Sequence, residues 1–149
     1  MALSDIARKI ERSTNKVALE RTTRKGWTPE LTGYAGYGNT EFVHVLGRVL
    51  MHDPAAEATE TWAQRGYRQF FTIQVNNLDV RVTVNGKTVH GRTNYNGYLD
   101  ILVHEHGLGA GWHEVVIEAD GAEPITSEVL IVSEDSPLGV VSDIDDTVM

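Results

Sequence analysis

Short runs in which apolar residues alternate with polar ones fill the chain from residue 42 onward. These runs predict β-strands at 42–51, 70–75, 79–84, 87–90, 98–103, 113–118 and 127–132. Tight turns between strands are predicted by three dipeptides, Asn85-Gly86, Asn96-Gly97 and Asp120-Gly121. Short strands separated by such turns indicate a mainly β chain. We expect an antiparallel β-sandwich, either immunoglobulin-like or transthyretin-like.

The N-terminal residues have a helical period instead. Ser4 is a suitable capping residue, and an apolar stripe within 3–20 is formed by Leu3, Ile6, Ile10 and Val17. We expect an amphipathic helix, within an N-terminal segment 1–26, that lies on the surface through this stripe. Two other interpretations remain open: a helix attracted to anionic lipid headgroups, and a disordered arm.

Glycines mark two further places. The segment Gly33–Gly38 is rich in glycine and tyrosine, which predicts a loop leading into the first strand. Gly47, inside that strand, predicts a bulge or a close approach of two backbones.

The last residues break the alternating pattern. A linker is predicted at 134–137, and Leu138–Val141 is an unbroken apolar run, typical of a strand that is buried on both faces of a parallel sheet. We therefore divide the chain into the helix at 1–26, a β-sandwich at 27–136, and the start of a second, α/β domain at 137–149.

Charge and composition exclude several classes of protein. The 149 residues include no cysteine, so disulfide scaffolds and zinc–thiolate sites are excluded. The net charge of −8 argues against nucleic-acid binding. The charge is also uneven, because residues 1–25 contain seven basic and three acidic residues, whereas 93–149 contain twelve acidic residues and no Lys or Arg.

Three aspartates directly after the apolar run form the strongest chemical signal. Asp143, Asp145 and Asp146 repel one another unless a cation or a turn compensates them. At the carboxyl end of a parallel strand they would stand where α/β sheets bind ligands. The first carboxylate could attack phosphorus, and the second could act as general acid and base. An acidic turn is the alternative, but the apolar strand before the aspartates and Thr147 after them favour a phosphate site.

The segment Gly139-Val-Val-Ser-Asp-Ile-Asp-Asp-Thr-Val148 resembles motif I, Asp-x-Asp-x-Thr, of the haloacid-dehalogenase superfamily. Its flanks resemble the actin-patch-type phosphatidate phosphatase family. Four upstream segments also resemble parts of that family's N-terminal β-sandwich. They are Gly36-Tyr-Gly38, Val45-Leu-Gly-Arg-Val-Leu50, Asn96-Gly-Tyr98 and Gly111-Trp112. The resemblance extends over residues 34–148.

This resemblance implies a role for each residue of the motif. Asp143 is the implied nucleophile and Asp145 the general acid and base. A Mg²⁺ ion would be held by the Asp143 carboxylate and the Asp145 carbonyl. Thr147 would support the loop or the phosphate, and Asp146 would be structural.

Such a site also needs a Ser or Thr, a Lys and a further Asp pair, which in the family lie beyond motif I. No Lys or Arg follows Arg92 in this sequence. We therefore expect a fragment of a phosphatase, truncated after motif I, that is inactive by itself.

Other candidate sites have weaker support. His104 and His106 would share one face of an extended segment, and His113 follows, but solvated histidines at a strand end are favoured over a metal site. Packing in the core or at its rim is expected for Trp27, Trp62 and Trp112. Ser136 and Ser142 have no arranged partners for a hydrolase triad.

Two functions remain open. The first is a Mg²⁺-dependent phosphatidate phosphatase, acting on phosphatidate or another phosphomonoester through an aspartyl-phosphate. The alternative is a non-catalytic β-sandwich module that binds a protein, a lipid surface or a carbohydrate. Since residues 1–20 contain no continuous apolar signal segment, we expect a cytoplasmic protein with peripheral membrane contact through residues 3–25.

Overall fold

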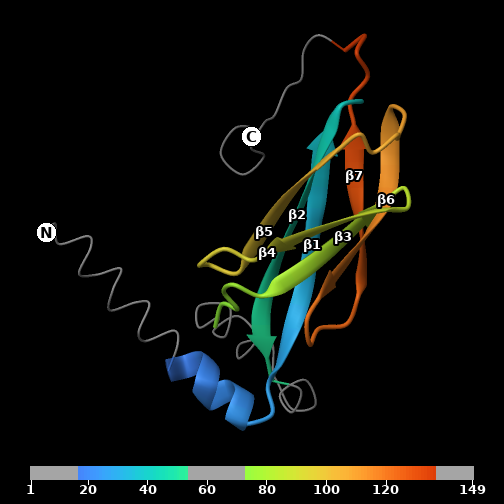
Figure 1. Ribbon diagram of the computed structural model, residues 1–149. Helices are drawn as coiled ribbons and strands as arrows, with labels where there is room; N and C mark the ends of the chain where they lie inside the picture. The colour runs from blue at the N-terminus through green and yellow to red at the C-terminus, as the bar shows by residue number, and fades with distance from the viewer. Residues whose placement is uncertain (1–16, 54–72, 137–149) are drawn as a thin grey trace, which may run out of the picture.

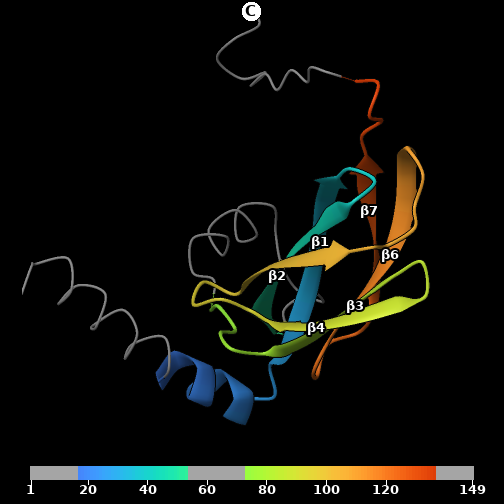
Figure 2. The same cartoon turned by 45° about the horizontal axis from the view of Figure 1, so that its top comes forward.

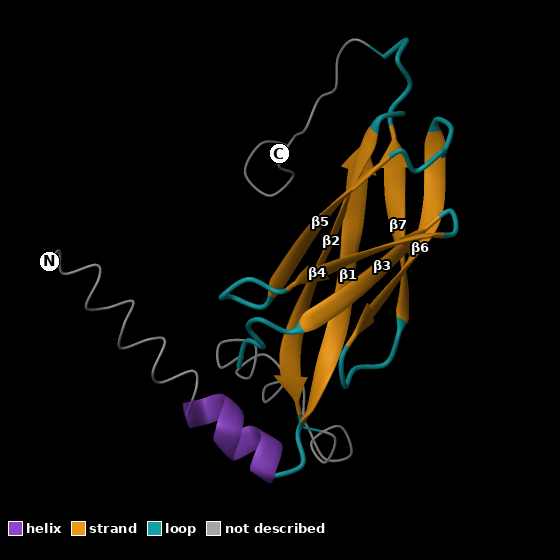
Figure 3. Cartoon of the chain, in the orientation of Figure 1, coloured by secondary structure: helices purple, strands orange, loops and turns teal. Residues whose placement is uncertain are grey.

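The computed structural model describes residues 17–53 and 73–136. Within these ranges it contains a short helix at residues 17–24 and seven strands (Figures 1 and 3). The strands are β1 (Thr28–Gly38), β2 (Phe42–His52), β3 (Asp79–Val84), β4 (Lys87–Arg92), β5 (Tyr98–His104), β6 (Gly111–Ala119) and β7 (Ile125–Ile131). No helix in the described part of the chain is long and apolar enough to cross a membrane.

All seven strands belong to a single mixed sheet with the order β4-β3-β6-β7-β1-β2-β5. Neighbouring strands are antiparallel except β1 and β7, which pair in parallel over three residues, Gly36–Gly38 with Val129–Ile131. The prediction of a mainly β chain is therefore confirmed. The prediction of two purely antiparallel sheets differs from the structure, because the β1–β7 ladder joins the strands into one.

The sheet curls until its two edge strands, β4 and β5, lie close together (Figure 2). A Cβ atom added to Gly91 of β4 would stand 2.9 Å from the Ile101 Cδ1 atom of β5. Lys87 Nζ donates a hydrogen bond to the His104 carbonyl across the same gap, at 2.7 Å. Glycine and a flexible cation thus let the two edges approach without a hydrogen-bonded ladder, and the result is a nearly closed, barrel-like sheet.

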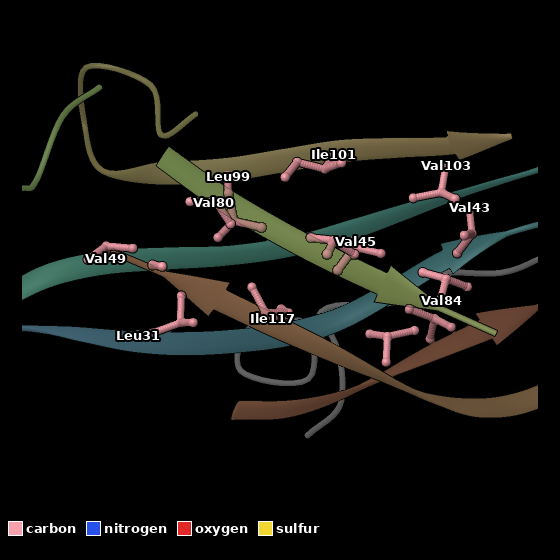
Figure 4. Close-up of a cluster of buried hydrophobic side chains, with 14 of the residues drawn as sticks. Leu31, Val43, Val45, Val49, Val80, Val84, Leu99, Ile101, Val103 and Ile117 are labelled. Atoms are coloured by element: carbon pink, nitrogen blue, oxygen red, sulfur yellow. The ribbon is translucent and has the colours of Figure 1, made fainter. Parts of the chain in front are cut away.

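Valine dominates the core that this curled sheet encloses (Figure 4). In β2 every second residue is buried, and β3, β5 and β6 also turn alternate residues inward. Branched side chains suit this arrangement because they fit a pleated, half-buried surface. Among the described residues, the largest fully buried side chains include Leu99, Ile117, Ile131, His106, Val43, Val45, Val49, Val80, Val82, Val84, Val103 and Val115.

Six of the predicted strands are confirmed, with ends that shift by up to two residues. The turn at Asn85-Gly86 is also confirmed, with φ angles of 47° and 77°, as a two-residue hairpin requires. The predicted strand 70–75 lies partly outside the described residues. Its remainder forms only an isolated bridge between Gln74 and Leu50.

The prediction of a loop at Gly33–Gly38 is wrong, because this segment forms the second half of β1. The backbones around it approach so closely that a Cβ atom on Gly36 would lie 2.3 Å from the His44 carbonyl oxygen. Glycine is therefore required there by proximity. Gly47 confirms the expected close approach, since its added Cβ would be 2.8 Å from the Thr32 carbonyl oxygen.

The described helical residues extend past the predicted end at residue 20. Val17, assigned to the buried stripe, is 47% exposed. Leu19 packs against the core in its place, together with Trp27. The remaining residues of the predicted helix lie outside the described part of the chain.

Candidate functional site

The outward side of β1, β2 and β5 is the most distinctive surface of the described chain. The valines of β2 and β5 point into the core, so the residues between them point to solvent. Many of these outward residues are aromatic. The surface, called the aromatic face below, consists of Tyr34, Tyr37, Phe42, His44, Leu46, Arg48, Tyr98, Asp100, Leu102 and His104.

One cluster on the aromatic face brings together residues of three strands. The Tyr34 and Tyr98 ring centroids lie 6.5 Å apart and the rings are tilted by 36°. The Arg48 guanidinium lies 4.5 Å above the Tyr98 ring, a cation–π contact. Arg48 Nε also donates to the Asn96 carbonyl at 3.3 Å, which fixes the guanidinium over the ring.

A second cluster lies further along the same strands and is centred on His44. Its ring stacks against Tyr37, with centroids 5.2 Å apart, and meets the Phe42 ring edge-on at 5.8 Å. His44 Nδ1 donates to the Asp100 carboxylate at 2.7 Å. A carboxylate that holds Nδ1–H leaves Nε2 as the acceptor of the neutral ring. This nitrogen makes no hydrogen bond within the described residues.

A row of mostly apolar and aromatic side chains continues from the aromatic face onto β7 and β6. Strand register places Trp112, Leu130, Tyr37, His44 and Leu102 side by side on five consecutive strands. Trp112 is 59% exposed and Tyr37 is 55% exposed. The prediction that Trp112 packs in the core or at its rim is therefore wrong, whereas Trp27 does pack against the core.

The three candidate histidines do not converge. Glu105 adopts a left-handed conformation, with φ of 51°, which ends the alternation after His104. His104 consequently remains on the outer face, while His106 is 2% exposed. His113 Nε2 donates to the Gly109 carbonyl at 2.8 Å. Across residues 17–53 and 73–136, no group of three or more His, Asp or Glu side chains could hold a metal ion.

The residues predicted to catalyse lie outside the described residues. These are Asp143 and Asp145, with Thr147 as the predicted support of the phosphate loop. Asp146, Ser142 and Trp62, for which no catalytic role was predicted, also lie outside the described residues. Of the two serines weighed for a triad, only Ser136 is described. It is exposed, and its backbone N–H donates to the Ser133 carbonyl at 3.0 Å.

The aromatic face was missed by the sequence analysis, although a signal for part of it was present. In Phe42-Val-His-Val and in Tyr98–His104 the residues between the core positions are, apart from Asp100, themselves aromatic, apolar or imidazole. A strand of an antiparallel sheet with such residues on both sides presents one of those sides to solvent. Tyr34 and Tyr37 could not be found in this way because their segment was interpreted as a loop.

The sequence was also compared with protein-family models and with curated proteins, and neither comparison found a match.

Proposed function

We propose that these residues come from a Mg²⁺-dependent phosphatidate phosphatase, in which a β domain precedes a haloacid-dehalogenase-type catalytic domain. The observation that carries the proposal is the run Leu138–Val141 followed by Asp143-x-Asp145-x-Thr147. The last strand of the described sheet, β7, ends at Ile131. The motif thus follows the β domain in the sequence, as a separate catalytic domain would require.

In this proposal Asp143 attacks the phosphorus atom and Asp145 protonates the leaving oxygen, then removes a proton from water. Thr147 supports the phosphate loop. Carboxylate and carbonyl oxygens at Asp143 and Asp145 are ligands of the kind that Mg²⁺ prefers. When bound, Mg²⁺ would neutralise charge on the phosphoryl oxygens.

We expect the 149-residue chain itself to be inactive. The phosphoryl group needs a cationic partner, and residues 93–149 contain no Lys or Arg. The test measures phosphate release from phosphatidate and from p-nitrophenyl phosphate, with and without Mg²⁺, for this chain and its Asp143→Asn variant. Equal background rates are expected. Turnover that disappears in Asp143→Asn would show a working site and contradict the proposed inactivity.

The coding sequence beyond residue 149 tests whether these residues come from a longer phosphatase. The proposal expects it to continue into α/β sequence that supplies the missing Lys and Asp residues. A stop codon at this point would instead favour a binding module as the whole function.

For the β domain we propose an immunoglobulin-like sandwich. The strand order follows that architecture if β1 to β7 correspond to strands A, B, C, C′, E, F and G. The two layers would then be β5-β2-β1 and β4-β3-β6-β7, joined where β1 passes beside β7. The three-residue length of the parallel ladder supports such a junction between two layers.

A second candidate function for the β domain is non-catalytic binding, and the aromatic face favours it. Tyr34 and Tyr37 on β1 and Tyr98 on β5 are each at least 40% exposed, and these two strands flank β2. Exposed apolar surface of this kind marks interaction sites more often than a solvated sheet does. Binding and the phosphatase proposal are compatible, since a binding domain can orient a catalytic one.

For localisation we propose the cytoplasm, with peripheral membrane contact through residues 3–25. The basic excess of this segment supports the proposal, because anionic headgroups attract clustered Lys and Arg. The phosphatidate substrate proposed above would lie in the same surface.

A further inference from the structure

We propose that the aromatic face binds a neutral oligosaccharide. This inference rests on the binding function proposed for the β domain, and it specifies the chemistry of the ligand. Three properties of the face support it: rings that lean over the sheet, hydrogen-bonding groups held beside them, and the absence of net charge.

The first property is the inclination of the rings. Tyr34 and Tyr98 belong to β1 and β5, which flank β2. Strands separated by one other strand lie roughly 10 Å apart. The two ring centroids are only 6.5 Å apart, so both rings lean toward each other over β2. The Arg48 guanidinium covers one face of Tyr98, but Tyr34 and Tyr98 remain 42% and 40% exposed. The face of a sugar ring can pack against these exposed parts through its C–H groups.

The second property is a set of oriented polar groups next to the Tyr34 and Tyr98 rings, further along the same strands. His44 is held by its hydrogen bond to Asp100, so its Nε2 atom is ready to accept a sugar hydroxyl. The Asp100 carboxylate, which is 59% exposed, has acceptor sites left for further hydroxyls. The tyrosine hydroxyls add groups that both donate and accept. Hydroxyl-rich ligands need this combination of acceptors and donors.

The third property is charge. Arg48 and Asp100 are the formally charged residues of the aromatic face, and their charges cancel. Arg48 is engaged with Tyr98, and Asp100 with His44. The whole chain carries −8, so this face differs from the average of the molecule. A neutral polyhydroxylated ligand matches such a face, whereas an anionic lipid or a nucleic acid would find no cationic excess there.

The experiment is a calorimetric titration of the 149-residue chain with three neutral probes, cellohexaose, maltohexaose and N-acetylchitohexaose. We expect at least one probe to bind with a dissociation constant on the order of 100 μM to 1 mM, as for a shallow surface. Binding should be insensitive to salt because no net charge is neutralised.

Two variants locate the site. Tyr34→Ala and Tyr98→Ala should each weaken binding by about tenfold, since loss of one aromatic contact costs up to about 1.5 kcal/mol. Val116→Ala is the matched control, because Val116 is 41% exposed on β6 and Tyr98 is 40% exposed on β5. The control should bind as the unchanged chain does. Circular dichroism of all variants checks that the sheet remains folded.

Three results would overturn the proposal. The first is no binding of any probe, and the second is binding that Tyr34→Ala and Tyr98→Ala leave intact. The third is binding of phosphatidylcholine vesicles that both variants abolish, with no binding of the sugars, which would assign the face to a lipid surface. None of these results alters phosphate release, so failure here is distinguishable from failure of the phosphatase proposal.

Discussion

His106 connects three segments of the chain through one buried side chain and its carbonyl. Its Nε2–H donates to the Asn39 carbonyl at 2.9 Å, and its Nδ1 accepts the Leu108 N–H at 3.1 Å. Its own carbonyl accepts a hydrogen bond from the Asn85 side chain at 3.0 Å. The imidazole therefore provides a hydrogen-bond partner both for a carbonyl in the turn before β2 and for an N–H in the loop after β5. Both ring nitrogens are engaged, so His106 has a structural role.

We predict that His106→Ala lowers the free energy of unfolding by about 2–4 kcal/mol. The substitution leaves the part-buried Asn39 carbonyl and Leu108 N–H without the ring as partner and opens a cavity where the buried imidazole stood. His104→Ala is the natural control, because His104 is exposed two residues away, and we expect a change below about 0.5 kcal/mol. Urea unfolding followed by fluorescence measures both. Equal effects of the two substitutions would contradict this account.

The different fates of His104 and His106 illustrate a limit of sequence analysis. Their spacing of two predicted a shared face, and the alternation of β5 is regular as far as His104. The positive φ of Glu105 then reverses the direction of the next side chain. Such a conformation is uncommon in residues other than glycine. A glutamate gives no sequence signal for a positive φ angle, so the separation of the two histidines could not be predicted.

Among the strands, β1 connects the two halves of the sheet, because it pairs with both β2 and β7. Its register with β2 shifts between Tyr34 and Tyr37, which marks a β-bulge. Before the bulge Leu31 points inward, and after it Gly36 and Gly38 do. The bulge changes the direction of β1 at the point where it begins to pair with β7. Strand β1 thus pairs with two strands that run in opposite directions, β2 antiparallel to it and β7 parallel to it.

We predict that Gly36→Ala destabilises the domain by about 2 kcal/mol or more. The new methyl group would meet the His44 carbonyl oxygen and the Val129 side chain, so the β1–β2–β7 junction would have to move apart. Gly109→Ala serves as the control, since a Cβ atom there meets nothing within 4 Å. Thermal unfolding of the two variants measures the difference. A Gly36→Ala variant as stable as Gly109→Ala would argue against a close junction.

Most strands could be predicted because alternation with a period of two is a local property. The alternating Val80, Val82 and Val84 predict β3, and Asn85-Gly86 predicts its hairpin with β4. The pairing of β1 with β7 could not be predicted, since it depends on contacts between residues nearly a hundred positions apart. For the same reason the number of sheets was not predictable. Of the candidate sites, the motif around Asp143 had a recognisable sequence pattern, and the aromatic face had one only in its β2 and β5 residues. The contribution of β1 to that face depends on register.

On the scale of the whole molecule, the N-terminal segment differs from the rest of the chain in the sign of its net charge. The basic excess lies in residues 1–25, and the acidic excess lies beyond Arg92. Of this basic segment, Arg21, Arg24 and Lys25 are described, and all three are exposed. An anionic surface would attract the basic N-terminal segment and repel the acidic residues beyond Arg92. The chain would therefore approach such a surface in a preferred orientation.

This asymmetry predicts salt-sensitive binding to vesicles of phosphatidylcholine and phosphatidylserine, but not to phosphatidylcholine alone. Binding should fall when the salt rises from about 50 mM to about 300 mM, because screening shortens the reach of the charges. A Lys9→Gln, Arg12→Gln double variant should bind less, at about 1 kcal/mol for each basic residue. The matched control is Arg81→Gln with Arg92→Gln, which removes equal charge from the sheet. Co-sedimentation that the two double variants reduce equally would eliminate the segment 3–25 as the membrane contact.

The parallel ladder between β1 and β7 also has a consequence for synthesis on the ribosome. When only β1 to β6 have emerged, β1 can pair with β2, and β2 with β5, but the other edge of β1 has no partner within the sheet. The set β4-β3-β6 forms separately, and β7 is needed to link the two sets. Until translation passes Ile131, the nascent chain therefore exposes open strand edges, which favour pairing with other chains. Chaperone demand should peak in that interval and end abruptly with the seventh strand.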